Sequence, residues 1–479
     1  MILSIILIEK IIGYLLNYKY LPSKYKLSLS LVNKAVFKYI SKNYCNKLYL
    51  GRNIGNGSLD LKQTEIHLKN QYCLLKHISH LTCHTITMDN HNLPLTDLYS
   101  LSCVTIKTFF SYIQQFSYLR ELNLALTHET IIKSDYSSIT VFPRLEKFTI
   151  TCYYSINSHQ AIPSILELLQ YIRTVKHLEI KSAGSNTITK NIIIDEMERF
   201  TPNQLEFLLL IYGSSQITSH GCFLRQVNSL KKYINLNCTL SDLDLVYQFN
   251  ALTWLKLHFK LYTIGIDQFL SSINQKPTLT KLKLILSDDI TDTNWPQFQF
   301  IQSLELTGSI NVIASALASN YQCTSLKSLK LASNSPNNTS IFSPPINEFR
   351  EFFHYNKSIR KIQIQIKFSL VSQDHIGDVY LMLASNPHLK HIVLGITDNQ
   401  IDVNPSCEEL TNSKSVDRIT IVILGVKNMN VSHIKLPNFN LVNLITHNGF
   451  KKYQYRRDFK INYELPTTSI ISKILNFFK

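Results

Sequence analysis

Apolar residues recur along most of this chain in one short pattern: an apolar residue, two variable residues, a second apolar residue, one variable residue and a third apolar residue. Because the second and third apolar positions are two residues apart, both side chains point to the same face of a short strand. The first apolar residue falls in the turn that leads into that strand. Well-formed copies begin at Leu119, Leu145, Val175, Leu205, Leu252, Leu279, Ile301, Leu326, Ile359, Leu389 and Val416. The pattern predicts a series of short strands that bury one face.

Two weaker copies complete the series. A degraded copy, Leu230-Tyr233-Ile234-Leu236, fills its one wide gap, and Cys45-Leu48-Leu50 reads as an early copy. Between the expected strands, apolar residues recur every three or four residues, which is typical of amphipathic helices. Such series are Ile162-Ile165-Leu166-Leu169-Ile172, Ile266-Phe269-Leu270-Ile273 and Val379-Leu381-Met382-Leu383, the last followed by Pro387. Each repeat is therefore expected to run from a strand through a loop into a helix and back.

The copies begin 22 to 33 residues apart, which brackets the length of roughly 20–29 residues found in leucine-rich repeats. The chain therefore resembles leucine-rich-repeat proteins. The resemblance implies an α/β solenoid over residues 119–449, with parallel strands on its concave face and helices on its convex face; residues 45–118 would form a transition with early irregular repeats. The family's usual Asn, three residues after the third apolar position, occurs in this series only at Asn334. The loops that follow the strands are therefore expected to be irregular.

Residues 1–44 precede the repeats and carry two amphipathic segments, one over residues 3–16 and one over residues 26–41. Their apolar offsets and the sequence Ser30-Leu31-Val32-Asn33-Lys34 resemble an F-box, although Ser4 replaces the family's Pro and Val36 its Trp. The resemblance implies docking on a Skp-type adaptor, with these residues as contact surface or module core: Leu3, Leu7, Ile8, Ile11, Ile12, Leu15, Leu31, Val32 and Phe37. The alternative is a helical cap that shields the first repeat, as solenoids require.

An F-box followed by leucine-rich repeats implies the substrate-recognition subunit of an SCF-type cullin–RING ubiquitin ligase. Such a chain performs no chemistry itself, because partner enzymes transfer the ubiquitin. The alternative is a leucine-rich-repeat scaffold or signalling interactor without a ligase. In either case the target is expected to bind the variable positions beside the strand core: Arg120, Glu121, Asn123, Glu146, Lys147, Thr149, Lys176, His177, Glu179, Lys281, Lys283, Lys327, Lys330, Lys361 and Gln363.

The sequence lacks the usual signatures of catalysis. It has 13 Gly, with no phosphate-binding loop, no Gly-x-Ser-x-Gly and no His-Glu-x-x-His. We therefore expect neither enzymatic activity nor a cofactor. Cys73, His77, His80 and Cys83 have a spacing that zinc could use. Apolar residues interleave with them at repeat-like spacing, which favours the polar face of an early repeat, so no metal is expected.

The chain of 479 residues is basic, with 49 Lys and Arg against 33 Asp and Glu and a net charge of +16. The lysines are scattered, and only Lys451–Arg457 approaches a basic run, so nucleic acid is not an expected partner. An amphipathic segment follows at 469–479; residues 450–479 are expected to form a basic segment and a helix that caps the last repeat, rather than one that lies on a membrane or binds calmodulin. Nine widely spaced Cys and no membrane-spanning apolar stretch indicate a cytoplasmic or nuclear protein.

Overall fold

The computed structural model describes a set of separate ranges, several with short internal gaps: residues 10–13, 34–50, 66–83, 98–103, 117–126, 144–152, 174–182, 204–211, 226–259, 266–333, 346–365, 381–396, 413–424 and 439–457. These belong to two compact units. Unit 1 comprises Met1–Leu205, Tyr212–Arg225 and Tyr463–Lys479, and unit 2 comprises Glu206–Ile211 and Gln226–Asn462. Each unit has its own internally packed core, so each is described by itself.

Unit 1 contains a series of short strands, each hydrogen-bonded in parallel to the next. They are β1 (Lys47–Leu50), β2 (His80–Cys83), β3 (Ser100–Cys103), β4 (Glu121–Leu126), β5 (Lys147–Cys152) and β6 (His177–Ser182). Helix α3 (Lys34–Asn43) precedes them and buries Val36 and Ile40. Leu81 and Leu101 are buried in β2 and β3, so the strand pattern is already established within residues 45–118.

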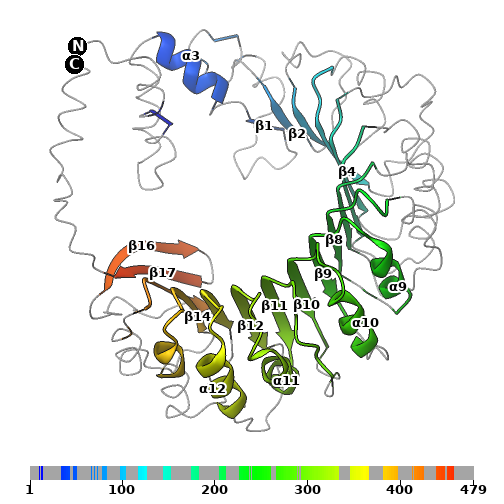
Figure 1. Ribbon diagram of the computed structural model, residues 1–479. Coiled ribbons are helices and arrows are strands. Elements are labelled where there is room, and N and C mark those ends of the chain that lie inside the picture. The colour runs from blue at the N-terminus through cyan, green and yellow to red at the C-terminus, as the bar shows by residue number, and fades with distance from the viewer. Residues whose placement is uncertain are drawn as a thin grey trace. The chain divides into compact units, whose positions relative to one another are not determined.

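Unit 2 also contains a series of short strands, β7 to β15, each hydrogen-bonded in parallel to the next. They are β7 (Phe207–Ile211), β8 (Lys232–Asn235), β9 (Trp254–His258), β10 (Lys281–Ile285), β11 (Ser303–Gly308), β12 (Ser328–Ser333), β13 (Lys361–Gln365), β14 (His391–Ile396) and β15 (Arg418–Leu424). Helices described in full are α9 (Leu240–Gln248), α10 (Ile266–Ile273), α11 (Ile310–Asn320) and α12 (Ile346–Tyr355), and residues 381–385 are also helical. These helices all lie on one side of the strands (Figure 1). The predicted repeat of parallel strands with helices on one side is confirmed in the described part of unit 2.

The predicted apolar positions form the core. In every well-formed copy from Leu119 to Val416, the first two apolar residues are buried, and in the copy beginning at Leu279 all three are at most 1% exposed. Helix α10 likewise buries Ile266, Phe269, Leu270 and Ile273, which is the predicted face. A continuous dry core of this kind holds each strand in fixed register with its neighbours, because a slip of one residue would turn the apolar side chains outward.

The degraded copy differs from its prediction. Asn235 pairs in register with Leu257 on β9 and with Leu210 on β7, so a polar residue occupies the third core position. Its side chain is fully buried, and Nδ2 donates to the hydroxyl of Tyr233 at 3.3 Å. Ile234 is buried as the pattern predicted, at 8% exposure, although its side chain alternates to the face of β8 opposite Tyr233 and Asn235. Because its amide has a partner, Asn235 is tolerated where the other copies place an aliphatic side chain.

A shared backbone hydrogen bond joins the starts of successive strands. The carbonyl oxygen of Glu146 accepts from the amides of both Lys176 and His177 at 2.9 Å, and that of Gln302 accepts from Lys327 and Ser328 at 2.8 and 2.9 Å. The same two-donor arrangement recurs at Thr253, Lys327 and Arg360, among others. We call these carbonyl-bearing positions, one before each strand, the strand-start row. They fix the register of each strand before its ladder begins.

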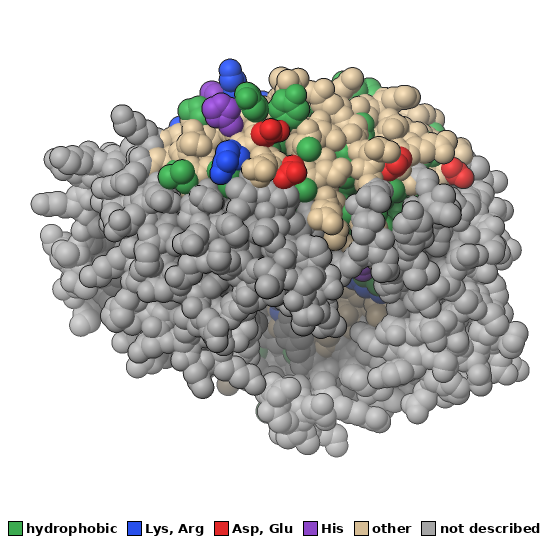
Figure 2. Space-filling model, turned by 90° about the horizontal axis from the view of Figure 1, so that it is seen from below, with side chains coloured by type: hydrophobic (Ala, Val, Ile, Leu, Met, Phe, Trp, Pro, Cys, Tyr) green, Lys and Arg blue, Asp and Glu red, His purple; other side chains and the backbone are tan. Residues whose placement is uncertain are grey.

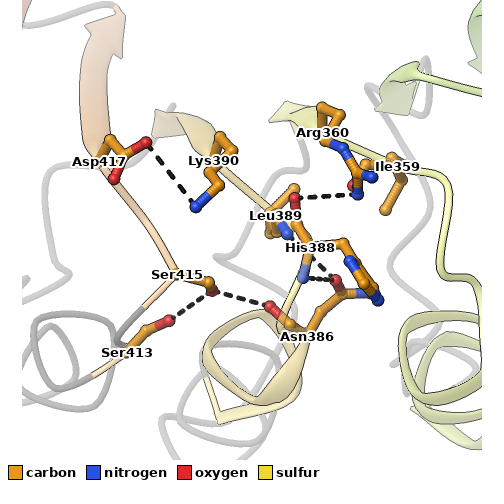
Figure 3. A network of polar contacts seen from close by, with 9 residues as sticks. All are labelled: Ile359, Arg360, Asn386, His388, Leu389, Lys390, Ser413, Ser415 and Asp417. Carbon is orange, nitrogen blue, oxygen red and sulfur yellow. Dashed lines mark hydrogen bonds and ion pairs between the residues drawn. The ribbon is translucent and has the colours of Figure 1, made fainter.

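Buried asparagines support some of these turns in unit 2, and Figure 3 shows the one at Asn386. The side-chain oxygen of Asn386 accepts from the amides of His388 and Leu389 at 2.9 and 3.1 Å, and Nδ2 donates to the carbonyls of Phe353 and Asn356 at 2.8 and 2.9 Å. Asn356 repeats this arrangement one repeat earlier, with Nδ2 reaching the carbonyls of Asn320 and Cys323. These asparagines precede the strands, whereas the family position that Asn334 occupies follows the strand and lies outside the described residues.

The sheet of unit 2 ends differently from the prediction for residues 450–479. Strand β17 (Phe450–Arg457) pairs antiparallel with β15 on one side and with β16 (Phe439–His447) on the other. The basic stretch Lys451–Arg457 is therefore a sheet strand, and the expected boundary at residue 449 falls inside a hairpin. The capping helix expected at 469–479 lies outside the described residues.

Candidate binding surface

The face of the strands opposite the helices offers the clearest candidate site. In strands such as β9, β10 and β11, side chains alternate between the buried core and the face opposite the helices, which we call the helix-free face. Figure 2 shows the molecule from below, where hydrophobic, basic, acidic and histidine side chains of the described residues are interspersed without forming one patch of a single kind. A site of ordered side chains is therefore best sought on the strands, where the shared register sets the side chains in rows.

Most of the predicted target-binding residues lie on this helix-free face. Glu121, Asn123, Lys147, His177 and Glu179 lie on it in unit 1, as do Lys281, Lys283, Lys330, Lys361 and Gln363 in unit 2. Thr149 shares the row of Asn123 and Glu179, but is only 6% exposed. Arg120, Glu146, Lys176 and Lys327 belong instead to the strand-start row, at the edge of the face. Within each unit, the predicted residues therefore lie on one face of the strands or along its edge.

In unit 1 the face carries a carboxylate held by two lysines. Glu179 lies 3.1 Å from the ammonium of Lys147 on β5 and 2.6 Å from that of Lys181 on its own strand. Burial raises the pKa of Glu179, but the hydrogen bonds from Lys181 and Lys147 outweigh it, so the net pKa is lowered from its usual value. The neighbouring positions Asn123 and Thr149 are uncharged. Glu121 lies in register with Lys147, so two carboxylates, Glu121 and Glu179, balance two lysines, Lys147 and Lys181, on this part of the face.

Unit 2 carries a longer row in register across β9, β10, β11 and β12: Lys256, Lys283, Glu305 and Lys330. We call it the lysine row. The carboxylate of Glu305 lies 2.5 Å from the Lys283 ammonium and 2.6 Å from that of Lys330. Burial raises the pKa of Glu305, but the hydrogen bonds from Lys283 and Lys330 lower it by more. The net pKa of Glu305 is therefore below its usual value. Burial and the charge of Lys283 lower the pKa of Lys256.

Beside the lysine row lies a surface that the sequence analysis did not single out. Strand β7 reads Phe-Leu-Leu-Leu-Ile, with Leu208 and Leu210 buried and the alternate residues half-exposed. Leu209 pairs in register with Ile234, which is only 8% exposed, and Trp254 lies nearby on β9, in register with Lys232. We call Leu209, Ile211, Ile234 and Trp254 the apolar platform. The signal in the sequence was the absence of alternation in β7, because the strands of the other copies place mostly polar residues at these positions.

Few of the predicted adaptor-binding residues fall within the described residues. Ile12 is 5% exposed, and Phe37 lies half-exposed in α3. The remaining ones lie outside the described residues: Leu3, Leu7, Ile8, Ile11, Leu15, Leu31 and Val32. Val36, at the position of the family's Trp, is buried in α3. The F-box resemblance therefore remains a prediction.

The zinc spacing is only partly described. Cys73 is buried, and His80 in β2 lies 2.8 Å from the hydroxyl of Ser79, while His77 and the side chain of Cys83 lie outside the described residues. Burial and the charge of Lys47 lower the pKa of His80. Within the described ranges, no three His, Cys, Asp or Glu side chains are grouped so as to hold a metal ion. Within the same ranges, no helix is long and apolar enough to cross a membrane.

Comparison of the sequence with models of known protein families gave no match, and comparison with curated proteins found none of significant similarity.

Proposed function

We propose that this protein is a non-catalytic binding protein that holds a target protein on its helix-free face. The observation that carries the proposal is the set of in-register rows of half-exposed polar and charged side chains on consecutive strands, backed by a dry core. Side chains fixed by such a core lose little conformational entropy when a partner binds. A repeat array also offers an extended surface, which suits a protein partner better than a small molecule.

We further propose that the target is recruited to an SCF-type cullin–RING ubiquitin ligase, with residues 1–44 docking on its Skp-type adaptor. Support comes from the F-box-like apolar offsets of that segment and from its position before the leucine-rich repeats. The burial of Val36 at the position of the family's Trp is consistent with a packed helical module. The widely spaced cysteines fit a cytoplasmic or nuclear protein. If residues 1–44 are only a cap, the same solenoid serves as a scaffold or signalling interactor.

The ligase role is tested by pulling down purified Skp-type adaptor with the full-length protein. The variant Ile8→Asp/Ile12→Asp places charges on the apolar stripe of the first segment and is expected to abolish binding. Lys10→Glu, at an exposed position of the same segment, is the matched control and should bind like the wild type. Circular dichroism of each variant checks that the repeats remain folded. If the wild type fails to bind the adaptor, or the double variant binds equally well, the scaffold alternative takes its place.

A further inference from the structure

We propose that the apolar platform and the lysine row together bind an extended acidic segment of a partner protein, anchored at one end by apolar side chains. The inference rests on the proposed target-binding function and specifies the chemistry of the target. Both surfaces lie in unit 2, on the helix-free face of neighbouring strands, so one segment can contact both.

The charge of this face calls for an acidic partner. In the described strands β8–β13, Glu305 is the only acidic side chain on the helix-free face, and Lys283 and Lys330 already hold it. The remaining lysines of these strands form no ion pair with a described carboxylate: Lys232, Lys256, Lys281 and Lys361. Lys256 is half-buried beside Lys283, and that burial lowers its pKa. An incoming carboxylate would relieve the repulsion within the row and favour the charged form of Lys256.

The apolar platform calls for an apolar anchor. Leu209 and Ile211 on β7 and Trp254 on β9 are half-exposed, and Ile234 on the intervening strand β8 is only 8% exposed. Apolar groups grouped on a surface gain free energy when a partner removes them from water. Lys232 lies 5.9 Å from the ring centre of Trp254, so the platform passes directly into the basic part of the face.

The spacing of the strands sets the length of the segment. Neighbouring strands lie about 4.8 Å apart, so the path from β7 to β12 spans roughly 24 Å. An extended chain rises about 3.3 Å per residue, which corresponds to about seven residues. The expected segment therefore has apolar residues at one end, over β7–β9, and carboxylates over β9–β12.

Glu305 favours a protein segment over a nucleic acid. Its carboxylate occupies the middle of the lysine row, where it would repel a phosphate backbone that follows the row. Nucleic-acid surfaces commonly combine arginines with several stacking aromatic side chains. In the described strands β7–β12, this face carries no Arg, and its large aromatic side chains are Phe207 and Trp254 rather than an extended series.

The test uses the full-length protein and a fluorescein-labelled peptide of about seven residues, with Leu and Phe at one end and alternating Glu at the other. Fluorescence anisotropy is expected to show binding that weakens as salt rises from about 50 to about 300 mM, because the charges are partly exposed. Lys256→Glu/Lys281→Glu should weaken binding about tenfold or more. Leu209→Thr/Ile211→Thr, which retains strand-forming side chains, should also weaken it about tenfold. Lys357→Glu, an exposed charge reversal outside these strands, is the control and should bind like the wild type.

Several results would overturn the inference. One is equal binding of a peptide with Lys in place of Glu, and another is unchanged binding by Lys256→Glu/Lys281→Glu. Tighter binding of a short oligothymidylate that displaces the peptide would assign the face to nucleic acid instead. If the adaptor pulldown succeeds and the peptide fails, recruitment stands and this site is wrong. If the peptide binds and the adaptor does not, the site stands and the ligase role is wrong.

Discussion

Glu179 in unit 1 and Glu305 in unit 2 are two versions of one motif, a half-buried carboxylate held by two lysines on the helix-free face. They differ in where the lysines come from. Glu179 takes one from its own strand, whereas Glu305 bridges the strands on either side of it. In both, hydrogen bonds from lysine overcome the effect of burial and lower the pKa.

The surroundings of the two glutamates differ more than the motif itself. Around Glu179 the aligned positions are uncharged, and a second carboxylate, Glu121 in register with Lys147, balances the second lysine. Around Glu305 the lysines continue through Lys256 on β9 and Lys361 on β13 without further carboxylates on the face of the described strands. The repeated strand register thus fixes the positions of the side chains on the face. The residue types at the variable positions set the charge of each region.

The turns before the strands separate the two units in a second way. In unit 1, Thr174 donates its hydroxyl to the carbonyl of Leu145 at 2.8 Å, and Gln204 donates to that of Val175 at 3.0 Å. In unit 2, Asn356 both donates to two carbonyls and accepts from the amides of Ser358 and Ile359. Among the described turns, the side chain of Asn356 therefore supports four backbone groups at once.

The largest expected effect is the loss of stability when Asn356 is replaced, compared with the loss at Thr174. Asn356→Ala leaves two backbone amides and two carbonyls without their side-chain partner in a buried turn, and is expected to lower the free energy of unfolding by about 3 kcal/mol. Thr174→Val, the unit 1 counterpart, is expected to cost about 1 kcal/mol. Urea unfolding followed by circular dichroism measures both. Asn250→Ala, at an exposed side chain, should change little, and equal losses at Asn356 and Thr174 would remove the contrast.

The next effect concerns pH. Because the folded pKa of Glu305 lies below its unfolded value of 4.5, its contribution to stability is complete above about pH 4.5 and is lost as the pH falls through the folded pKa. The free energy of unfolding of Glu305→Gln should therefore fall less steeply with acid than that of the wild type. Urea titrations between about pH 7 and pH 3 measure this difference. Glu351→Gln, an exposed change on α12, should follow the wild-type curve; if Glu305→Gln does so as well, the lysine contacts do not hold the carboxylate in solution.

The smallest effect is expected at the edge of unit 1. Arg120 and Glu146 lie 3.2 Å apart in the strand-start row, with about half of each side chain exposed. Water and salt screen such a pair, so a double-mutant cycle with Arg120→Ala and Glu146→Ala should give a coupling free energy below about 0.5 kcal/mol. A coupling above about 1 kcal/mol would place this edge among the stabilising contacts of unit 1.

The core was the part of the fold most accessible from the sequence. Spacings such as Leu279-Leu282-Leu284 predicted burial correctly, because a period of two on a strand places the last two side chains on one face. Asn235 was missed because its burial depends on a hydroxyl from Tyr233, which a hydrophobic pattern does not register. The hairpin of β16 and β17 was not predicted. The lysines and arginines of Lys451–Arg457 indicated a basic surface segment, although its two tyrosines alternate as in a strand.

The candidate surface was predicted in part for a similar reason. Lys281, Lys283 and Lys330 followed from their places between core residues. The apolar platform did not, because a strand that is apolar at every position does not reveal which face is covered. Glu305 was missed because its importance comes from register with two other strands, and single-copy spacing contains no information about the neighbouring copy.

The strand-start row has a consequence for how this chain can change over evolution. Each carbonyl in the row bonds only to the repeat that follows it, and the distance along the chain to that repeat is irrelevant to the bond. Residues can therefore be gained or lost in the connecting loops at small cost, since loop closure depends weakly on length. A single deletion within a strand would instead put every later side chain of that strand on the wrong face. The copies begin 22 to 33 residues apart, as expected if the connecting loops vary in length while the strands keep a fixed length and register.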